Sequence, residues 1–325
     1  MTGNTLGWVI VAFVLYLLMM IAIGAFYAKG NNNSEDYFLG GRKLNGFVAA
    51  LSAQASDMSG WLLMGLPGAI YLTGVGGDGW IAIGLFIGTT LNWLFIATKL
   101  RRYTIRANNS VTLPTYFENR FHDDKKVLMT VSSITIVVFF LVYCASALSA
   151  GGQLFESVFG IDYHVALTIG ALVVLVYTFL GGFTAVCVTD FIQGMLMLVG
   201  ILAVPLFAYH FLTGNGTTLA AGLEASGADS ANFLNLMKNG DGSNNIISVI
   251  SGLGWGLGYF GMPHILVRFM AVRDEKEMTK SKATAISWVA LSLGFAVFIG
   301  ILGRAYLPEL VNGNHEKVFI EMIKK

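Results

Sequence analysis

Residues 53–61 read AQASDMSGW, and they place Asp57 in the middle of a segment, residues 45–73, that has no other charged residue. A carboxylate inside hydrocarbon costs at least about 2.5–3.5 kcal/mol on insertion scales, so such a residue usually faces a cavity or a partner. No Lys or Arg lies within a helical turn or two of Asp57 along the chain. We therefore expect a cation from solution to supply the opposite charge. The alternative is a protonated or water-solvated Asp57 near a helix end.

The composition of the whole chain points to a lipid environment. Hydrophobic residues make up 55% of the 325 residues and charged residues only 12%, whereas about a quarter of the residues of soluble domains are charged. The formal net charge of +1 indicates no nucleic-acid partner. Cys144 and Cys187 both lie in apolar segments and suggest neither a disulfide framework nor a metal site.

Apolar stretches of about twenty residues with at most one charged residue are long enough to cross about 30 Å of hydrocarbon. We predict eight such spans, over residues 6–28, 45–73, 78–98, 127–150, 163–181, 188–212, 246–270 and 284–306. Lys and Arg gather after spans one, three and seven, whereas residues 74–77 and 151–162 have none and residues 213–245 have only Lys238. Because Lys and Arg favour cytoplasmic loops, we predict that the N-terminus lies outside. The 213–245 connection is either a cover over the bundle mouth or a simple solvated linker.

Two of the spans contain residues that interrupt helices. Span two continues as GLPG over residues 65–68, and span seven reads GLGWGLGYFGMPH over residues 252–264. Glycines at alternate positions free backbone carbonyls, which membranes tolerate only where they face protein, water or an ion. Paired interrupted helices point to a transporter site, and their separation by five spans suits an inverted repeat of five helices. Glycine-mediated helix packing is the alternative for span seven, but it does not explain an acid within span two.

Other polar and aromatic residues are candidates with two interpretations each. Asp190 near the inner end of span six is a second functional acid or an exposed interfacial one. Trp255 and Tyr259 share one helical face and either line a substrate pocket or pack in the bundle. Tyr143 is a substrate contact or a core hydrogen-bonding group. The five histidines form no HExxH pair, no phosphate loop or nucleophile elbow is present, and the chain is therefore not expected to be an enzyme; for His264 a structural hydrogen bond is expected.

Four motifs in this order along the chain resemble the sodium/solute symporter family: SDMSGWLLMGLPGA at 56–69, YCAS at 143–146, YTFLGGF at 177–183 and GWGLGYFG at 254–261 before Pro263 and His264. The resemblance implies an all-helical, leucine-transporter-like inverted-repeat fold with discontinuous second and seventh spans. Residues 1–325 would form one transmembrane domain, with an extra helix at 6–28, a first five-helix repeat at 45–212 and the start of a second repeat at 246–325.

Family members usually have about thirteen spans in such inverted repeats, and this chain supplies eight before it ends. The later helix with the family's Ser and Thr sodium ligands is absent, so we expect the fragment alone to lack a complete sodium site and not to transport.

The resemblance also implies a function. Inward sodium flow would drive uptake of a small solute by alternating access in the bacterial cytoplasmic membrane, and the first and last motifs favour L-proline over sugars. Carried over by position, the sodium ligands would be the backbone carbonyls of Ala55 and Met58, with Asp57 essential and Asp190 at a possible additional sodium or coupling site. The residues around the substrate would be Asp57, Gly60, Tyr143, Trp255, Tyr259 and Pro263. Arg42 of GGR at 40–42 and Ser59 would serve gating or coupling.

Two other functions stay open at this point. Related transporter-like domains occur fused to signalling kinases, so the chain could belong to a membrane sensor. It could also be a non-transporting fragment, and another small amino acid or organic solute could replace proline as the substrate.

Overall fold

The computed structural model describes residues 3–324, and its named elements in that range are all helical. The chain divides into two compact units, each described by itself below. Unit 1 comprises Met1–Asp57, Phe95–Gln193 and Pro263–Ser281, and unit 2 comprises Met58–Leu94, Gly194–Met262 and Lys282–Lys325. The expectation of a single transporter domain over residues 1–325 stays a prediction.

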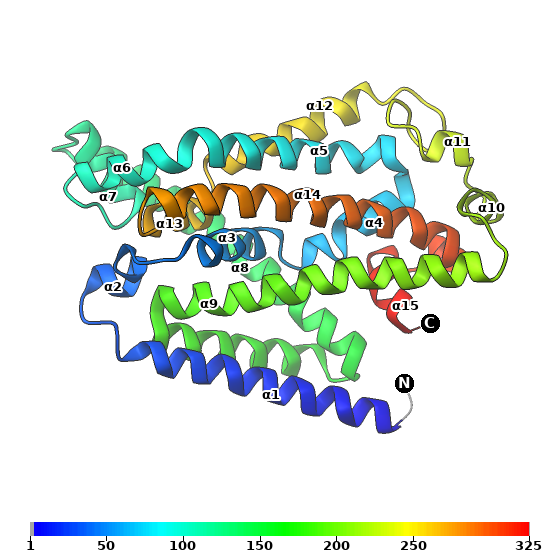
Figure 1. The fold of residues 1–325 in the computed structure, drawn as a ribbon, viewed down its shortest axis with the longest axis horizontal. Coiled ribbons are helices and arrows are strands. Elements are labelled where there is room, and N and C mark those ends of the chain that lie inside the picture. Colours follow the sequence, from blue (N-terminus) through cyan, green and yellow to red (C-terminus); the bar gives the residue numbers. More distant parts are fainter. Residues whose placement is uncertain (1–2, 325) are drawn as a thin grey trace. The chain divides into compact units, whose positions relative to one another are not determined.

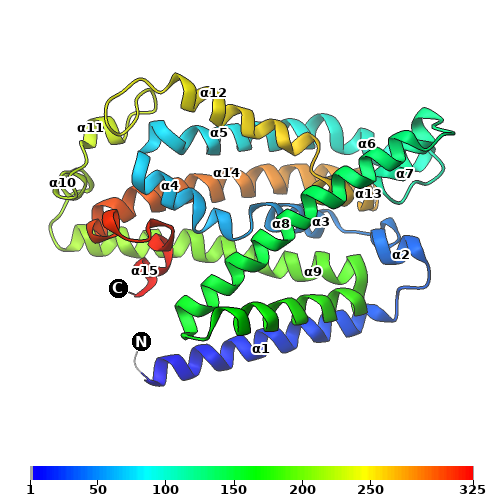
Figure 2. The same ribbon diagram turned by 180° about the vertical axis from the view of Figure 1, so that it is seen from behind.

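In unit 1 two long apolar helices, α8 and the first part of α9, pack on α1. Its helices are α1 (Gly3–Ala28), α2 (Ser34–Leu39), α3 (Gly46–Met58), α6 (Thr98–Arg106), α7 (Leu113–Phe121), α8 (Val127–Phe159), the first part of α9 (Tyr163–Gly214) and α13 (Pro263–Ala271). α1 runs beside the first part of α9 in both views (Figures 1 and 2). A Cβ atom on Gly24 would lie only 2.9 Å from the backbone oxygen of Tyr177, so this packing requires glycine.

Unit 2 holds α4 (Gly65–Thr73), α5 (Val75–Leu91), the second part of α9, α10 (Leu219–Ala225), α11 (Ser230–Phe233), α12 (Ile246–Trp255), most of α14 (Glu275–Tyr306) and α15 (Val318–Lys324). A π-helix, Asn92–Ala97, follows α5 directly. The polar 213–245 connection contains α10 and α11, and the side chains of Thr218 and Asp229 cap the amino ends of these two helices. The connection is therefore folded and is not simply a solvated linker.

Five helices are long and apolar enough to cross a membrane within residues 3–324, and the count is six if α12 and α13 together form one interrupted span. Eight spans were predicted, and the lower number has two causes. Predicted spans five and six lie in one 52-residue element, α9, whose non-helical backbone at Gly182 (φ 61°, ψ −158°) separates them. Predicted span two is split into α3 and α4, which are 13 and 9 residues long and too short to be counted singly.

Both predicted helix interruptions are confirmed. In span two, α3 ends at Met58, a 3₁₀ turn covers Gly60–Leu62 and α4 begins at Gly65. In span seven, α12 ends at Trp255, a 3₁₀ segment covers Gly256–Phe260 and α13 begins at Pro263. Glycine lowers helix propensity by about 1 kcal/mol relative to alanine, and proline cannot donate the hydrogen bond that a helix interior needs. The glycine and proline residues at each interruption are therefore sufficient to end the first half-helix there.

Helices α5 and α12 lie side by side in unit 2 through glycine faces (Figure 1). A Cβ atom on Gly84 would lie 2.2 Å from the backbone oxygen of Gly252, and one on Gly88 would lie 2.2 Å from that of Gly256. Backbone therefore meets backbone at two successive turns of α5. This is the small-residue packing that lets membrane helices approach closely, so the packing interpretation of the span-seven glycines is correct for Gly252 and Gly256.

The variant Gly84→Ala should destabilise the protein, because its methyl group would overlap the Gly252 carbonyl on a backbone that cannot move aside. Overpacking of this kind costs roughly 1–3 kcal/mol, which thermal unfolding in detergent would detect. Gly254→Ala on α12 is the matched control, since nothing lies within 4 Å of a Cβ atom there. Equal melting temperatures for the two variants would contradict the close contact.

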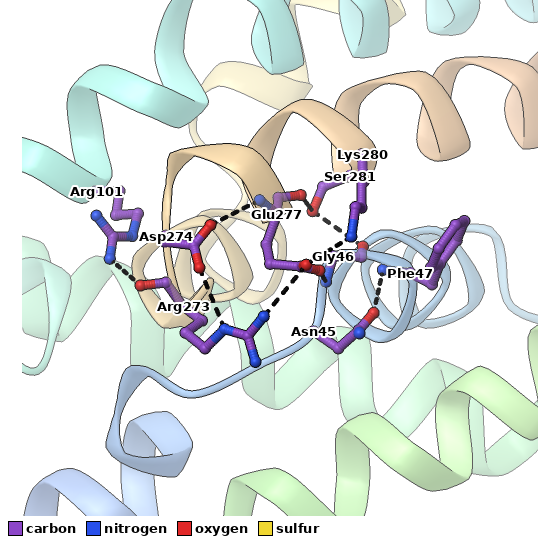
Figure 3. A network of polar contacts seen from close by, with 9 residues as sticks. All are labelled: Asn45, Gly46, Phe47, Arg101, Arg273, Asp274, Glu277, Lys280 and Ser281. Atoms are coloured by element: carbon purple, nitrogen blue, oxygen red, sulfur yellow. Dashed lines mark hydrogen bonds and ion pairs between the residues drawn. The ribbon is translucent and has the colours of Figure 1, made fainter.

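In unit 1, a polar network joins the amino end of α14 to the amino end of α3 (Figure 3). The backbone N–H of Gly46 donates to Glu277 Oε2 at 2.7 Å, and Ser281 Oγ donates to the Gly46 carbonyl at 2.9 Å. Arg273 and Lys280 form ion pairs with the same Glu277 carboxylate at 3.3 and 2.8 Å. Asp274 caps α14 by accepting from the Glu277 backbone N–H at 2.9 Å. The network fixes where the discontinuous second span begins.

The Asp274 cap should make stability depend on pH. The backbone N–H of Glu277 is the main cause that holds the pKa of Asp274 below its ordinary value. A carboxyl with a lowered folded-state pKa stabilises the fold above the unfolded pKa of about 3.9 and loses that contribution as pH falls through the folded pKa. Asp274→Ala should therefore lower the melting temperature by about 2–4 °C at pH 7, with the difference vanishing in acid.

Asp274→Asn is the control for this cap, because an asparagine amide oxygen caps as well as a carboxylate but does not titrate in this range. Its advantage over Asp274→Ala should persist below pH 4. A wild-type advantage that does not change with pH would contradict the role of the carboxylate.

Candidate functional site

The candidate site begins where α3 stops inside span two. Ser59 follows the helix with φ 44° and ψ −151°, a backbone conformation that residues with a side chain rarely adopt. The last four carbonyls of any helix have no intrahelical donor, and the carboxyl end of a helix carries a partial negative charge. Gly60 comes next, with nothing within 4 Å of the position of a Cβ atom. The interruption thus presents backbone oxygens and an open backbone surface together.

Asp57 lies in the last turn of α3 beside the first turn of α13, and both belong to unit 1. Its side chain is 8% exposed, and Oδ1 lies 3.5 Å from Nε2 of His264. The His264 ring stacks on the ring of Tyr143, with centroids 5.6 Å apart and planes at 21°. Tyr143 in turn donates its hydroxyl hydrogen bond to the backbone carbonyl of Ser56 at 2.9 Å. The hydrogen bond expected for His264 is not formed in the described part of the chain, and the ring lies next to Asp57 instead.

Asp190 of α9 is buried in a second polar cluster, which it forms with Ser52 and Ser56 of α3. Its Oδ2 accepts hydrogen bonds from Ser52 Oγ at 2.7 Å and Ser56 Oγ at 2.9 Å. Arg268 of α13 forms an ion pair with the same oxygen at 2.7 Å. Arg268 also donates to Ser52 Oγ and Ser56 Oγ, both at 2.7 Å. The alternative interpretation of Asp190 as an exposed interfacial acid is wrong, since only 8% of the residue is exposed.

Arg268 is buried within span seven and does not belong to the basic loop residues that follow it. It lies within α13 and is 4% exposed. A buried carboxylate next to a guanidinium is already neutralised, so the Asp190 cluster holds its charge without a bound cation. Whether Asp190 also serves a sodium ion stays a prediction. The sequence could have pointed to Arg268 as a site residue, because it lies four residues after His264 and therefore on the same helical face.

Unit 2 contains the predicted aromatic site residues Trp255 and Tyr259. The rings of Trp61 and Trp255 stack, with centroids 5.9 Å apart and planes at 20°. Tyr259 is 3% exposed and lies in the 3₁₀ segment Gly256–Phe260. The side-chain amide of Asn92 donates to the Tyr259 carbonyl at 2.7 Å. Neither Trp61 nor Asn92 was predicted as a site residue. The only sequence signals for them were the position of Trp61 in the motif at 56–69 and the polar side chain of Asn92 in an apolar span.

Arg42 lies in unit 1, between α2 and α3, with its side chain held by four hydrogen bonds. The acceptors are Asn109 Oδ1, Thr104 Oγ1 and the carbonyls of Met270 and Ser110, at 2.8–3.2 Å. Burial lowers the pKa of Arg42, while the nearby Glu35 carboxylate acts in the opposite direction. The guanidinium thus connects the chain before α3 to the end of α13. A role of Arg42 in gating or coupling stays a prediction.

The predicted site residues are divided between the two units. Unit 1 brings together Asp57 and Tyr143 beside the start of α13, with Pro263, and it also contains Ala55 and Asp190; unit 2 contains Met58, Ser59, Gly60, Trp255 and Tyr259. Among the described residues no three His, Cys, Asp or Glu side chains gather as a metal site. The expected sodium ligands are mainly backbone carbonyls, so this finding does not bear on them.

The ion pair of Arg268 with Asp190 should be essential for stability. Breaking a buried pair leaves an uncompensated charge and costs roughly 3–5 kcal/mol, so Arg268→Leu should strongly lower the melting temperature in detergent. The double variant Arg268→Leu with Asp190→Leu removes both charges and should regain most of the loss. A double variant that is as unstable as the sum of its single variants would contradict a direct pair.

Comparison with known proteins adds the family context. The model of the sodium:solute symporter family matches residues 37–325. The chain is 44% identical to the sodium/proline symporters of Escherichia coli (strain K12) and Haemophilus influenzae, over 319 and 321 residues and 96% and 97% of its length. It covers 62% and 63% of these relatives, which is less than two thirds of their length.

A solved structure of a Na⁺-coupled sialic acid symporter, described as substrate-bound and outward-open, is similar with a TM-score of 0.75 over 94% of this chain and 64% of that one. Its sequence identity of 20% makes it evidence for the fold alone.

Proposed function

Because the chain belongs to the sodium:solute symporter family, we propose that it carries the solute-binding part of a transporter that couples inward sodium flow to the uptake of L-proline. The family transports solutes with sodium and is not enzymatic, and the chain is a multi-pass membrane protein with the leucine-transporter-like fold. Proline is supported by the 44% identity to sodium/proline symporters along 96% of the chain. The chain spans about three fifths of those relatives, so transport is proposed for the full-length protein.

The observation that carries the proposal is the end of α3 beside a buried carboxylate. The backbone oxygens of Ala55 and Met58 lie in its last turn, where helical carbonyls lack intrahelical donors, and Asp57 lies between them. Unwound carbonyls and the carboxyl ends of half-helices coordinate sodium in transporters of this architecture. We propose that sodium binds here first, neutralises Asp57 and orders the segment Ser59–Gly60 for substrate.

Proline has a carboxylate and an apolar ring, and the proposal gives each of them a partner. The amino end of α13, at Pro263, carries a partial positive charge that attracts a carboxylate. The apolar ring is matched by aromatic side chains, for which Trp255 and Tyr259 are the proposed contacts, with Tyr143 and Gly60 completing the set. The open space at Gly60 supports a close approach of the substrate to the backbone. Arg42 and Ser59 are proposed to act in gating.

The proposed location is the bacterial cytoplasmic membrane, with the N-terminus outside. The support is the distribution of charge: the basic α6 and α7 region and the residues after α13 would lie inside, and the α10–α11 connection outside.

Proline uptake by the full-length protein in liposomes tests the proposal. Uptake should require an inward sodium gradient, and Asp57→Asn should reduce it by at least about 100-fold, since a lost charge-assisted contact in a water-poor site is worth several kcal/mol. Asp78→Asn is a matched control, because Asp78 is an acid in the first turn of α5 that accepts a hydrogen bond from Thr73 and lies outside the proposed site.

Substrate identity is tested separately by thermal stabilisation with amino acids and sugars. A ligand at 100 times its dissociation constant stabilises the folded state by about 2.7 kcal/mol. Stabilisation by another solute in sodium, with none by proline, would contradict the substrate, whereas sodium-independent uptake or full activity of Asp57→Asn would contradict the coupling role.

A further inference from the structure

The face of α5 that packs on span seven ends in a polar residue. Gly84, Gly88 and Asn92 are spaced four residues apart, so they lie on one face of the helix. The first two meet the backbone of Gly252 and Gly256 so closely that no side chain fits. Asn92 continues this row into the 3₁₀ segment, where it contacts Tyr259. The row therefore follows span seven from its regular helix into its interruption.

Asn92 satisfies a backbone group that the interruption frees. It is completely buried, and its Nδ2 donates to the Tyr259 carbonyl at 2.7 Å. A carbonyl released from a helix inside a membrane is costly unless a donor reaches it. The donor here comes from the first residue of a π-helix, Asn92–Ala97. π-Helical turns within α-helices are rare and are frequent at functional sites.

The hydrogen bond from Asn92 connects α5 to the proposed substrate site through Tyr259. Asn92 fixes the carbonyl of the residue whose ring is the proposed substrate contact, and the glycine contacts hold the helix on which Asn92 lies. This hydrogen bond and the contact of Gly88 with Gly256 together set where the 3₁₀ segment stands relative to α5, and the hydrogen bond is the one made at Tyr259 itself. Loss of this bond would leave the ring present but misplaced.

We propose that Asn92 is a positioning residue of the transport site, which holds the Tyr259 backbone and thereby sets the affinity for substrate. This inference rests on the proposed function, in which Tyr259 contacts the substrate. Asn92 itself touches neither substrate nor sodium in the proposal.

The test compares Asn92→Leu and Asn92→Ser with Thr89→Val in the full-length protein. Leucine is close to asparagine in size, and serine is small and too short to reach the carbonyl. Thr89 is the matched control because it is 1% exposed on the same helix and its hydroxyl has no hydrogen-bond partner in the described part of the chain.

Both Asn92 variants should raise the KM for proline roughly tenfold, the effect of one buried hydrogen bond with its partner left unsatisfied. Maximal uptake rate should stay within about twofold, since the residue acts on binding, and Thr89→Val should match the wild type.

Hydrogen exchange in the absence of substrate provides a second measurement. The backbone amides of residues 256–261 should exchange faster in both Asn92 variants than in the wild type and Thr89→Val, because the segment has lost its tether. Unchanged exchange in this segment would overturn the proposal. So would faster exchange with an unchanged KM in an active transporter, since the contact would then be structural only.

The two proposals fail in different ways. A wild-type protein that stabilises with another solute and not with proline contradicts the proposed substrate, and KM is then measured for the solute that binds. The exchange measurement needs no substrate and still decides whether Asn92 holds the segment.

Discussion

A helix that stops inside a membrane leaves backbone carbonyls that lipid cannot satisfy, and much of the described polar structure supplies donors for such carbonyls. Tyr143 donates to the carbonyl of Ser56 near the end of α3. Asn92 donates to that of Tyr259 in the second interruption. Arg42 reaches the carbonyl of Met270 near the end of α13. Side chains from distant parts of the sequence thus take over the role that the next helical turn would have played.

The same constraint explains why charged residues lie at depth. Arg268 and Asp190 are both buried, and two serines of α3 share their hydrogen bonds. A buried ion pair is weak evidence for stability by itself, but removing one partner is costly. The pair therefore fixes α13 against α3 close to Asp57, whose carboxylate lies beside His264.

The sequence predicted the interruptions because their causes are local. Glycines and prolines act within one or two turns, and α3 and α12 end within a few residues of the expected positions. The partners of the polar groups were not predictable in this way. Arg268 and Asp190 are 78 positions apart, and Asn92 and Tyr259 are 167 apart. Such pairings depend on the packing of whole helices, which periodicity within one span does not encode. The count of five or six is lower than the predicted eight because α9 counts once, although its backbone breaks at Gly182 between predicted spans five and six, and because α3 and α4 are each too short to count.

The glycine contact between α5 and α12 has a mechanical consequence. Interlocked backbones without intervening side chains have no soft layer that can deform, so α5 and α12 resist sliding along each other. Small sliding of packed helices is one of the common ways in which proteins change shape, and it is blocked at this seam. A displacement of α12 would therefore take α5 with it as one rigid element.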